Sequence, residues 1–394
     1  MRSKDPPLFF VNQYGWPDGA ATAQILCEVV RNPLPNRHVI LLQSRGQYSA
    51  VSGDDNEPAV QVRRLWAPGV SRERKLPKLA GFLAFYCQIV WILVTRPRGS
   101  DVIVMTKPPF LNWLGAIGKK LRGGRLVTWE MDVYPEILYS TGLVKERSWF
   151  GRFLKAVTRW ARTRTDLTIV LGSCMAKLVH QGGLAVQDSA ELHNWANGEI
   201  LHPVRTPGAA PLLRLLYSGN LGVAHDVETI AGAVDPLRGS PVELVFAGSG
   251  AVMWRMHRYA SERVLFQSAC GYGELNEVLN ASDIGIVTQT KASLGCVVPS
   301  KFYGILASGR GVLYVGPEQS TVAQVIRETG CGWTVALGDS EGMARLIREL
   351  EADRTRVREV GERARQVFEE RFTREKGEAR FWELLAGLDD KSPN

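Results

Sequence analysis

The chain has 394 residues and is too long for one ordinary domain. Of these residues 45% are hydrophobic and 22% are charged, a composition that excludes a disordered protein. Its formal net charge of +8 and pI near 9.2 favour anionic partners, such as nucleic acid, phosphorylated metabolites or an anionic membrane. Six cysteines lie far apart without a CxxC pair or a His partner at metal-ligand spacing, which disfavours disulfides and zinc and fits a reducing cytoplasm.

The N-terminal segment lacks the long apolar core of a signal peptide, so we expect a chain that is not secreted. Its first predicted strand, Leu8–Val11, runs into a loop that ends at Asp18 and Gly19, and a helix follows. In a doubly wound sheet such loops face the ligand crevice, where Gly15 and Gly19 would let the backbone approach a substrate closely. The spacing is not GxGxxG, so it does not indicate a dinucleotide site, and a plain turn is the alternative.

The stretch from Leu79 to Val94 is almost entirely apolar, with Gln88 as its single strongly polar residue. It is short for a bilayer span, which needs about 20 residues. A buried helix is one interpretation. The other is a helix that lies at a membrane interface or binds a hydrophobic ligand, which fits the basic residues on both sides of the stretch. A spanning helix is the third alternative.

Apolar runs alternate with helical stretches along the whole chain, which predicts βαβ units and parallel sheets. A Pro/Gly-rich passage, His202 to Pro211, interrupts the alternation and is typical of a linker. We therefore expect two doubly wound domains joined near residue 205. The first series of predicted strands is Leu8–Val11, His38–Leu42, Val60–Leu65, Val102–Met105, Arg125–Trp129 and Leu167–Leu171; the second is Leu213–Tyr217, Glu243–Phe246, Val264–Phe266, Ile284–Val287, Gly311–Val315 and Gly332–Val335.

Acidic residues follow the predicted strand Arg125–Trp129, at the carboxyl end where an acceptor hydroxyl would be held. The candidates are the three carboxylates Glu130, Asp132 and Glu136, with Tyr134 and Pro135 fixing the turn. Acids that cap a helix are the alternative interpretation. Lys107 lies in a similar loop after Val102–Met105, although it could be only surface charge.

Two further segments are weaker candidates. The stretch from His193 to Asn197 precedes the linker and would line an interdomain cleft or act as a hinge, although a lone His or Trp is usually structural. The helix from Lys145 to Arg164 is basic and rich in aromatic residues, so it could lie on anionic lipid, although such a face is more often solvated.

Three loops of the second domain, at 218–226, 247–250 and 293–301, are expected to meet at one sheet edge. They offer glycines, backbone N–H donors, His225 and Lys301, a combination that suits a diphosphate. Pro299 and Ser300 suit the start of a helix from about Ser300 to Ser308, with Lys301 beside free backbone N–H groups. An ordinary connection with a solvated lysine is the alternative.

The segment from Ser340 to Leu388 is predicted to be helical, with an apolar stripe late in it that must pack on something. We expect the last helix, about 373–388, to cross back onto the first domain. The domain boundaries are thus predicted at 1–204 and 205–372.

Seven stretches resemble the retaining glycosyltransferases of family 4, which have the two-domain GT-B architecture, and within them the bacterial polysaccharide and O-antigen assembly branch. They occur in the family's order and span most of the chain. The stretches are NQYGWPDGAATAQ at 12–24, TKPP at 106–109, EMDVYPE at 130–136, HNWAN at 193–197, YSGNLGVAHDVETI at 217–230, FAGSG at 246–250 and PSKFYGILASGR at 299–310.

The resemblance implies an α/β GT-B fold, with two Rossmann-like doubly wound domains facing each other across a cleft. It implies transfer of a hexosyl or N-acetylhexosaminyl group, with retention, from a nucleotide-sugar, with a UDP-sugar favoured. The acceptor would be lipid-linked or a glycan, bound by the first domain, and the donor would be bound by the second. No metal or other cofactor is expected, since basic side chains and helix N-termini neutralise the departing diphosphate.

The chain also departs from the family pattern. Many members carry two glutamates eight residues apart around the donor helix, and here Cys296 and Gly304 stand at those places. The usual Arg and Lys of the diphosphate loop are replaced by Asn220 and His225. We expect that Lys301, the Ser300 backbone and His225 hold the diphosphate instead.

The predicted mechanism places the donor diphosphate on the loops of the second domain, while the acceptor hydroxyl attacks from the side of Asp132 and Gly19. The predicted catalytic residues are Asp132, Lys301 and His225; the donor-binding residues are Gly19, Gly219, Asn220, Gly248, Ser249, Gly250, Pro299, Ser300, Tyr303 and Gly304; and the acceptor-binding residues are Asp18, Lys107, Tyr134 and Glu136.

Two other functions remain open from the sequence. A UDP-sugar 2-epimerase has the same architecture, and a non-catalytic sugar-binding or membrane-binding module fits the missing glutamates. Nucleic-acid binding is disfavoured, because the basic residues are spread over both domains. A cytoplasmic location is expected, with the inner face of the plasma membrane as an open site of peripheral attachment.

Overall fold

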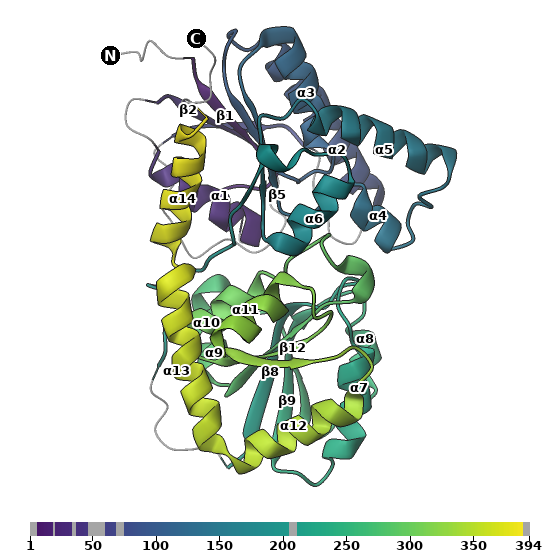
Figure 1. The fold of residues 1–394 in the computed structure, drawn as a ribbon, viewed down its shortest axis with the longest axis vertical. Helices are drawn as coiled ribbons and strands as arrows, with labels where there is room; N and C mark the ends of the chain where they lie inside the picture. Colours follow the sequence, from purple (N-terminus) through teal and green to yellow (C-terminus); the bar gives the residue numbers. More distant parts are fainter. Residues whose placement is uncertain are drawn as a thin grey trace. The chain divides into compact units, whose positions relative to one another are not determined.

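The computed structural model describes residues 6–18, 20–33, 37–45, 60–67, 75–204 and 211–388, with the backbone alone for 75–79. The chain divides into two compact units. One comprises Met1–His193 with Gly377–Asn394, and the other comprises Asn194–Lys376. Each unit contains a parallel sheet with helices on it (Figure 1).

The sheet of the first unit has seven strands within the described residues, in the order β3-β2-β1-β4-β5-β6-β7, and all neighbouring pairs are parallel. The strand order reverses between β1 and β4, so the loops after these two strands lie next to each other at the switch point. The strands are β1 (Leu8–Val11), β2 (Val39–Ser44), β3 (Gln61–Leu65), β4 (Val102–Val104), β5 (Leu126–Glu130), β6 (Leu167–Val170) and β7 (Ser189–Glu191).

Helices cover both faces of this sheet, because alternate strand residues point to opposite sides. Phe9 and Val11 share a core with Phe85 of α2. Phe10, between them, instead contacts Phe381 of α14, with ring centroids 6.0 Å apart. The helices of this unit are α1 (Ala21–Arg31), α2 (Lys75–Thr95), α3 (Leu111–Arg122), α4 (Glu136–Ser140), α5 (Trp149–Arg162), α6 (Ser173–Gln181) and α14 (Arg374–Ala386).

The sheet of the second unit has six strands in the part of the chain that the structure describes, in the order β10-β9-β8-β11-β12-β13, again all parallel. Its switch point lies between β8 and β11. The strands are β8 (Leu213–Asn220), β9 (Val242–Ser249), β10 (Val264–Gln267), β11 (Ile284–Thr288), β12 (Gly311–Val315) and β13 (Gly332–Val335); the helices are α7 (Glu228–Val234), α8 (Trp254–His257), α9 (Leu275–Asn280), α10 (Lys301–Ala307), α11 (Thr321–Thr329), α12 (Ser340–Ala352) and α13 (Arg354–Arg371).

The predicted fold class, two doubly wound α/β domains, is confirmed by these two sheets. One strand, β7, was not predicted, because it is short and not fully buried. Two predicted loops also start later than expected, since β8 extends to Asn220 and β9 to Ser249.

Glycine makes this extension of β8 and β9 possible. A Cβ atom on Gly248 would lie 2.2 Å from the carbonyl oxygen of Gly219, and the φ of Gly248 is +144°. A side chain cannot fit there. The glycines that were predicted to lie in open loops instead allow the backbones of β8 and β9 to approach each other closely.

The predicted linker contains residues 205–210, which lie outside the described part of the chain. The residues just before them belong to the second unit. The backbone N–H of His202 donates to Asn276 and that of Val204 to Asn280, at 3.0 and 2.8 Å, so this segment is fixed on α9.

Candidate active site

Lys301 is the first residue of α10, and its side chain turns back to the carboxyl end of β8. Its amine nitrogen lies 3.5 Å from the centre of the Tyr217 ring, a cation–π distance. The ring is fully buried, and its hydroxyl donates to the backbone oxygen of Asn220 at 2.9 Å. The carboxyl-terminal half of β8 therefore positions the ring that contacts the amine.

The Lys301 amine is shielded from solvent and makes no hydrogen bond within the described residues. Burial lowers its pKa well below the usual lysine value. Buried polar groups are nearly always hydrogen-bonded, so an amine in this state is a candidate for a ligand contact. The alternative of a solvated lysine is wrong.

His225 lies beside the same ring, with its imidazole edge-on to Tyr217 at 6.1 Å. Its Nδ1 lies 3.1 Å from the backbone nitrogen of Gly222 and 3.2 Å from the carbonyl oxygen of the same residue. Burial, followed by the nearby charge of Lys301, lowers its pKa to about 3. At neutral pH this residue therefore offers an N–H donor and not a positive charge.

A buried polar network holds the loop that leads into α10. Tyr314 donates to the Gln289 Oε1 atom at 3.0 Å, and Gln289 donates to the carbonyl oxygens of Ser293 and Val297 at 3.1 and 3.0 Å. Ser293 donates to the carbonyl oxygen of Ala224 at 2.8 Å, which ties this loop to the one that carries His225. Sequence analysis missed these supporting residues, because separate strands bring them together.

The start of α10 offers fewer free donors than predicted. The N–H groups of Phe302 and Tyr303 already donate to the carbonyl oxygens of Pro299 and Ser300, at 3.3 and 3.2 Å. Pro299 is buried and Ser300 is exposed. Tyr303 is 1% exposed and its ring packs on Phe302, which places it in the core of the unit.

Of the two positions where many family members have glutamates, one is buried and the other lies against apolar side chains. Cys296 is 3% exposed. A Cβ on Gly304 would contact side-chain carbons of Leu201 and Leu279, at 3.4 and 3.9 Å. A carboxylate at either place would lose solvation, so the local structure agrees with the departure seen in the sequence.

The other predicted donor-binding residues of the second unit lie at the ends of β8 and β9. Gly219 pairs with Gly248, and Asn220 with Ser249, in the parallel register. Asn220 and Ser249 are exposed. A Cβ on Gly219 would lie 4.0 Å from the Lys301 amine, whereas one on Gly250 would meet the carbonyl oxygen of Leu221 at 2.3 Å.

The first unit brings together three predicted residues from two neighbouring loops. Lys107, after β4, forms an ion pair of 2.5 Å with Asp132, after β5. The Lys107 amine also lies 6.0 Å from the Tyr134 ring centre. Burial opposes the charge on Lys107, but Asp132 and Tyr134 outweigh it and raise the pKa of the amine. Lys107 is therefore held as a cation and is not simple surface charge.

Glu136, by contrast, is engaged in a structural contact. Both of its carboxylate oxygens accept from Arg162 of α5, at 2.7 and 3.1 Å, and the Arg162 side chain is only 3% exposed. The pair joins α4 to α5. Glu130, the first of the three predicted carboxylates, is the last residue of β5. Burial raises its pKa to about 8, with a further increase from Glu136 and Asp132 and an opposing effect of Arg162.

The loop after β1 is shaped by its own side chains. Asp18 is buried, and its carboxylate accepts from the N–H of Ala20 at 2.9 Å, directly before α1. A Cβ on Gly15 would lie 2.1 Å from the Gln43 side chain, so glycine is needed there for packing. Gly19 lies outside the described residues.

The motif from His193 to Asn197 lies at the boundary between the two compact units, which falls between His193 and Asn194. His193 Nδ1 lies 3.1 Å from the carbonyl oxygen of Leu171, and Asn197 accepts from the N–H of Glu199 at 2.9 Å. The hinge role stays a prediction.

Among the described residues, no group of three or more His, Cys, Asp or Glu side chains is placed to hold a metal ion.

Comparisons with known proteins agree on the fold and on one class of enzyme. The chain is 27% identical over 272 residues to the "Probable glycosyltransferase WbjE" of Pseudomonas aeruginosa, a match that covers 66% of this chain and 68% of WbjE. It is 25% identical over 223 residues to WcaI of Escherichia coli, named as a glycosyl transferase of colanic acid biosynthesis, covering 52% of this chain and 54% of WcaI. No protein-family model matches the chain.

A similar solved structure is that of HepE from Anabaena in complex with UDP-glucose. The TM-score is 0.70 with 15% sequence identity, covering 97% of this chain and all of HepE. The fold is thus GT-B. The chain is similar to WbjE and WcaI, two proteins named as glycosyltransferases, so the resemblance drawn from the sequence is confirmed.

Proposed function

We propose that the protein transfers a hexosyl or N-acetylhexosaminyl group from a UDP-sugar to a lipid-linked or glycan acceptor in cell-surface polysaccharide biosynthesis. The named activity of WbjE, the pathway in the name of WcaI and the UDP-glucose bound to HepE support this proposal. The acceptor class rests on the family resemblance.

The observation that carries the proposal is the state of the Lys301 amine. It is shielded, has no hydrogen-bond partner in the described residues and lies at the switch point of the second sheet. Ligands of open α/β sheets bind at such a point. A diphosphate there would give the amine an anionic partner, and the imidazole N–H of His225 could donate to the same group.

In the proposed reaction, the bond between the sugar's anomeric carbon and the phosphate oxygen of UDP breaks. A bond from the same carbon to the acceptor oxygen forms on the same face. The acceptor proton passes to the departing phosphate oxygen, so UDP leaves as the anion that Lys301 stabilises. Charge neutralisation by this amine would replace a metal ion.

We assign the acceptor to the loops of the first unit that carry Lys107, Asp132 and Tyr134. The carboxylate of Asp132 can accept a hydrogen bond from an acceptor hydroxyl, while the ion pair with Lys107 orients it. Glu136 is a weaker acceptor-binding candidate, because Arg162 occupies both of its oxygens.

The proposal is tested by calorimetric titration of the protein with UDP, followed by a transfer assay. UDP should bind to the wild type, and Lys301→Ala should weaken binding about tenfold to a hundredfold, as expected when a charged hydrogen bond is lost. UDP should also be released from a UDP-sugar when membrane lipid extract is added. Isomerisation of UDP-N-acetylglucosamine without an acceptor would identify an epimerase. The absence of both transfer and isomerisation would indicate a non-catalytic module.

A further inference from the structure

The first unit exposes an unusual amount of apolar surface on three adjacent helices, α2, α3 and α5. Most of the large apolar side chains that are exposed in the described residues belong to them. We call this surface the apolar helix face; its members are Leu83, Val90 and Trp91 of α2, Ile117 and Leu121 of α3, and Trp149, Phe150 and Phe153 of α5. Figure 1 shows these three helices grouped on one side of the first sheet.

These helices expose large apolar side chains in addition to those that they bury, whereas a surface helix of a globular protein normally has one apolar side. In α5, Leu154 and Ala161 are buried against the unit, while Trp149 is 80% exposed and Phe153 is 51% exposed. In α2, Phe85 is buried while Trp91 is 69% exposed. A second apolar side in contact with water indicates a binding surface.

The charge of the three helices is entirely of one sign. Their sequences contain nine Lys and Arg residues and no Asp or Glu. Some of these cations have structural partners, such as Arg162 with Glu136. Lys120, Arg152 and Arg159 are exposed. Glu146, in the loop before α5, is the acidic neighbour and pairs with Lys155 at 2.6 Å.

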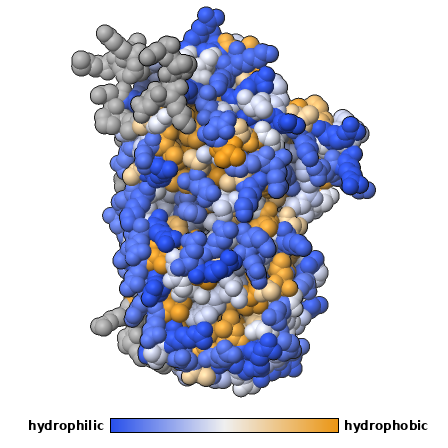
Figure 2. All heavy atoms as spheres, viewed as in Figure 1, coloured by the Kyte–Doolittle hydropathy of each residue, from blue (hydrophilic) through white to orange (hydrophobic). Residues whose placement is uncertain are grey.

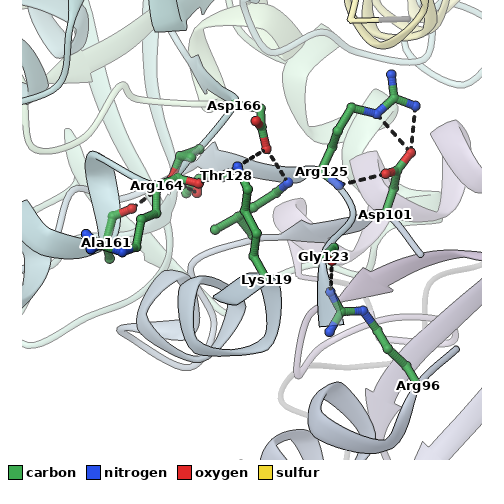
Figure 3. Close-up of polar contacts among 11 residues, drawn as sticks. Arg96, Asp101, Lys119, Gly123, Arg125, Thr128, Ala161, Arg164 and Asp166 are labelled. Carbon is green, nitrogen blue, oxygen red and sulfur yellow. Dashed lines mark hydrogen bonds and ion pairs between the residues drawn. The ribbon is translucent and has the colours of Figure 1, made fainter. Parts of the chain in front are cut away.

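Polar contacts behind the face hold the helices in place (Figure 3). Arg96, directly after α2, donates to the carbonyl oxygens of Gly118 and Gly123 at 3.1 and 2.7 Å, which joins α2 to α3. Lys119 of α3 donates to Asp166 and to the carbonyl oxygen of Arg164, at 2.6 and 2.9 Å, which joins α3 to the segment after α5. The apolar helix face is therefore one preformed surface.

A row of aromatic rings leads from this face to the candidate acceptor site. The distance between ring centroids is 6.5 Å for Phe153 and Trp113, 4.2 Å for Trp113 and Phe110, and 5.7 Å for Phe110 and Tyr134. Tyr134 in turn lies beside Lys107, the partner of Asp132. A molecule anchored on the face would have its polar end within reach of these residues.

We propose that the apolar helix face docks the protein on the surface of an anionic lipid bilayer. Aromatic and aliphatic side chains would enter the headgroup region, and exposed Lys and Arg would bind acidic headgroups, which is the pattern of interfacial helices. Figure 2 shows a small pale-orange area beside extensive blue hydrophilic surface on the projection formed by α5. No helix among the described residues is long and apolar enough to cross a membrane, so the contact would be at the surface.

This proposal rests on the proposed function, because a lipid-linked acceptor would lie in a membrane. Docking can nevertheless be tested without the donor or the acceptor. The full chain is sedimented with vesicles of phosphatidylcholine alone or with one quarter phosphatidylglycerol. The wild type should bind the anionic vesicles at least fivefold better. The double variants Trp149→Ser/Phe150→Ser and Arg152→Glu/Arg159→Glu should each lose at least fivefold of that binding.

The matched controls lie on the second unit. Trp254→Ser removes an aromatic side chain that is 66% exposed, and Arg345→Glu/Arg363→Glu reverses two exposed charges; both should bind within twofold of the wild type. Melting temperature and UDP binding verify that each variant is folded, and they report on the proposed function separately. The inference would be overturned if the α5 variants bound anionic vesicles as well as the wild type does. It would also be overturned if the wild type bound anionic vesicles no better than neutral ones. A lipid-free dimer that the Trp149→Ser/Phe150→Ser variant dissociates would overturn it as well, because a second copy would then cover the face.

Discussion

Lys301 and Tyr217 form a cation–π pair in which the amine has the ring on one side and no hydrogen-bond acceptor among the described residues. Such a pair compensates only part of the cost of removing an ammonium group from water. In the ligand-free protein the charged form of this amine is therefore poorly accommodated, and a bound diphosphate would favour it. Four predictions follow from this pair and from the ion pairs of the first unit.

Replacing Lys301 by methionine should stabilise the ligand-free protein while it removes donor binding. Methionine fills a similar volume without a buried charge, so we expect the free energy of unfolding to rise by about 1 kcal/mol. The increase in melting temperature that UDP gives to the wild type should vanish. Chemical denaturation with and without UDP measures both effects, and a variant that is destabilised yet still binds UDP would contradict them.

Binding of UDP should be accompanied by proton uptake. Because burial lowers the pKa of Lys301 in the folded chain, the unfolded chain binds more protons between that lowered pKa and the usual 10.5, and the free energy of unfolding rises with pH across this window. The diphosphate favours the charged amine, so UDP affinity should fall as pH rises through the window. Calorimetry at pH 8 in phosphate and in Tris would show the uptake as a difference in apparent enthalpy, which Lys301→Met should abolish.

Replacing Asp132 by asparagine should impair transfer without affecting the donor. The change removes the negative partner of Lys107, so the pKa of that amine falls and the acceptor loses an oriented carboxylate. We expect kcat/KM for the acceptor to drop at least tenfold. UDP affinity should stay within twofold, and a matching loss of UDP affinity would place Asp132 outside the acceptor site.

Glu136 and Arg162 should behave as a structural pair. Glu136→Gln leaves the buried guanidinium without its counter-charge, which should cost about 3 kcal/mol of folding free energy. Adding Arg162→Met should recover most of that loss, because the unpaired charge is then gone. A double-mutant cycle by urea denaturation measures the coupling. If Glu136→Gln left stability intact but abolished transfer, the original acceptor-binding prediction would be favoured.

The fold was largely predictable, because strands such as Val102–Val104 and Gly311–Val315 are buried on both faces and appear as apolar runs. The sequence could not reveal the short and partly exposed β7. It also could not reveal that β8 continues through Gly219, since glycine signals a loop unless a second backbone lies against it, as Gly248 does here.

The site was predictable in its residue types but not in its pairings. Lys301, His225, Lys107 and Asp132 could be placed near strand ends by the order of elements alone. That Lys301 would rest on Tyr217, 84 positions away in the numbering, depends on how the strands align in space. The same limit hid the Arg162 partner of Glu136, which comes from another helix.

The most direct measurement is a crystal structure of the protein with UDP bound. We expect a diphosphate oxygen within hydrogen-bond distance of the Lys301 amine, with the imidazole N–H of His225 directed at the same group. A diphosphate bound elsewhere, with the Lys301 amine still confined to the Tyr217 ring and making no contact to the ligand, would contradict it.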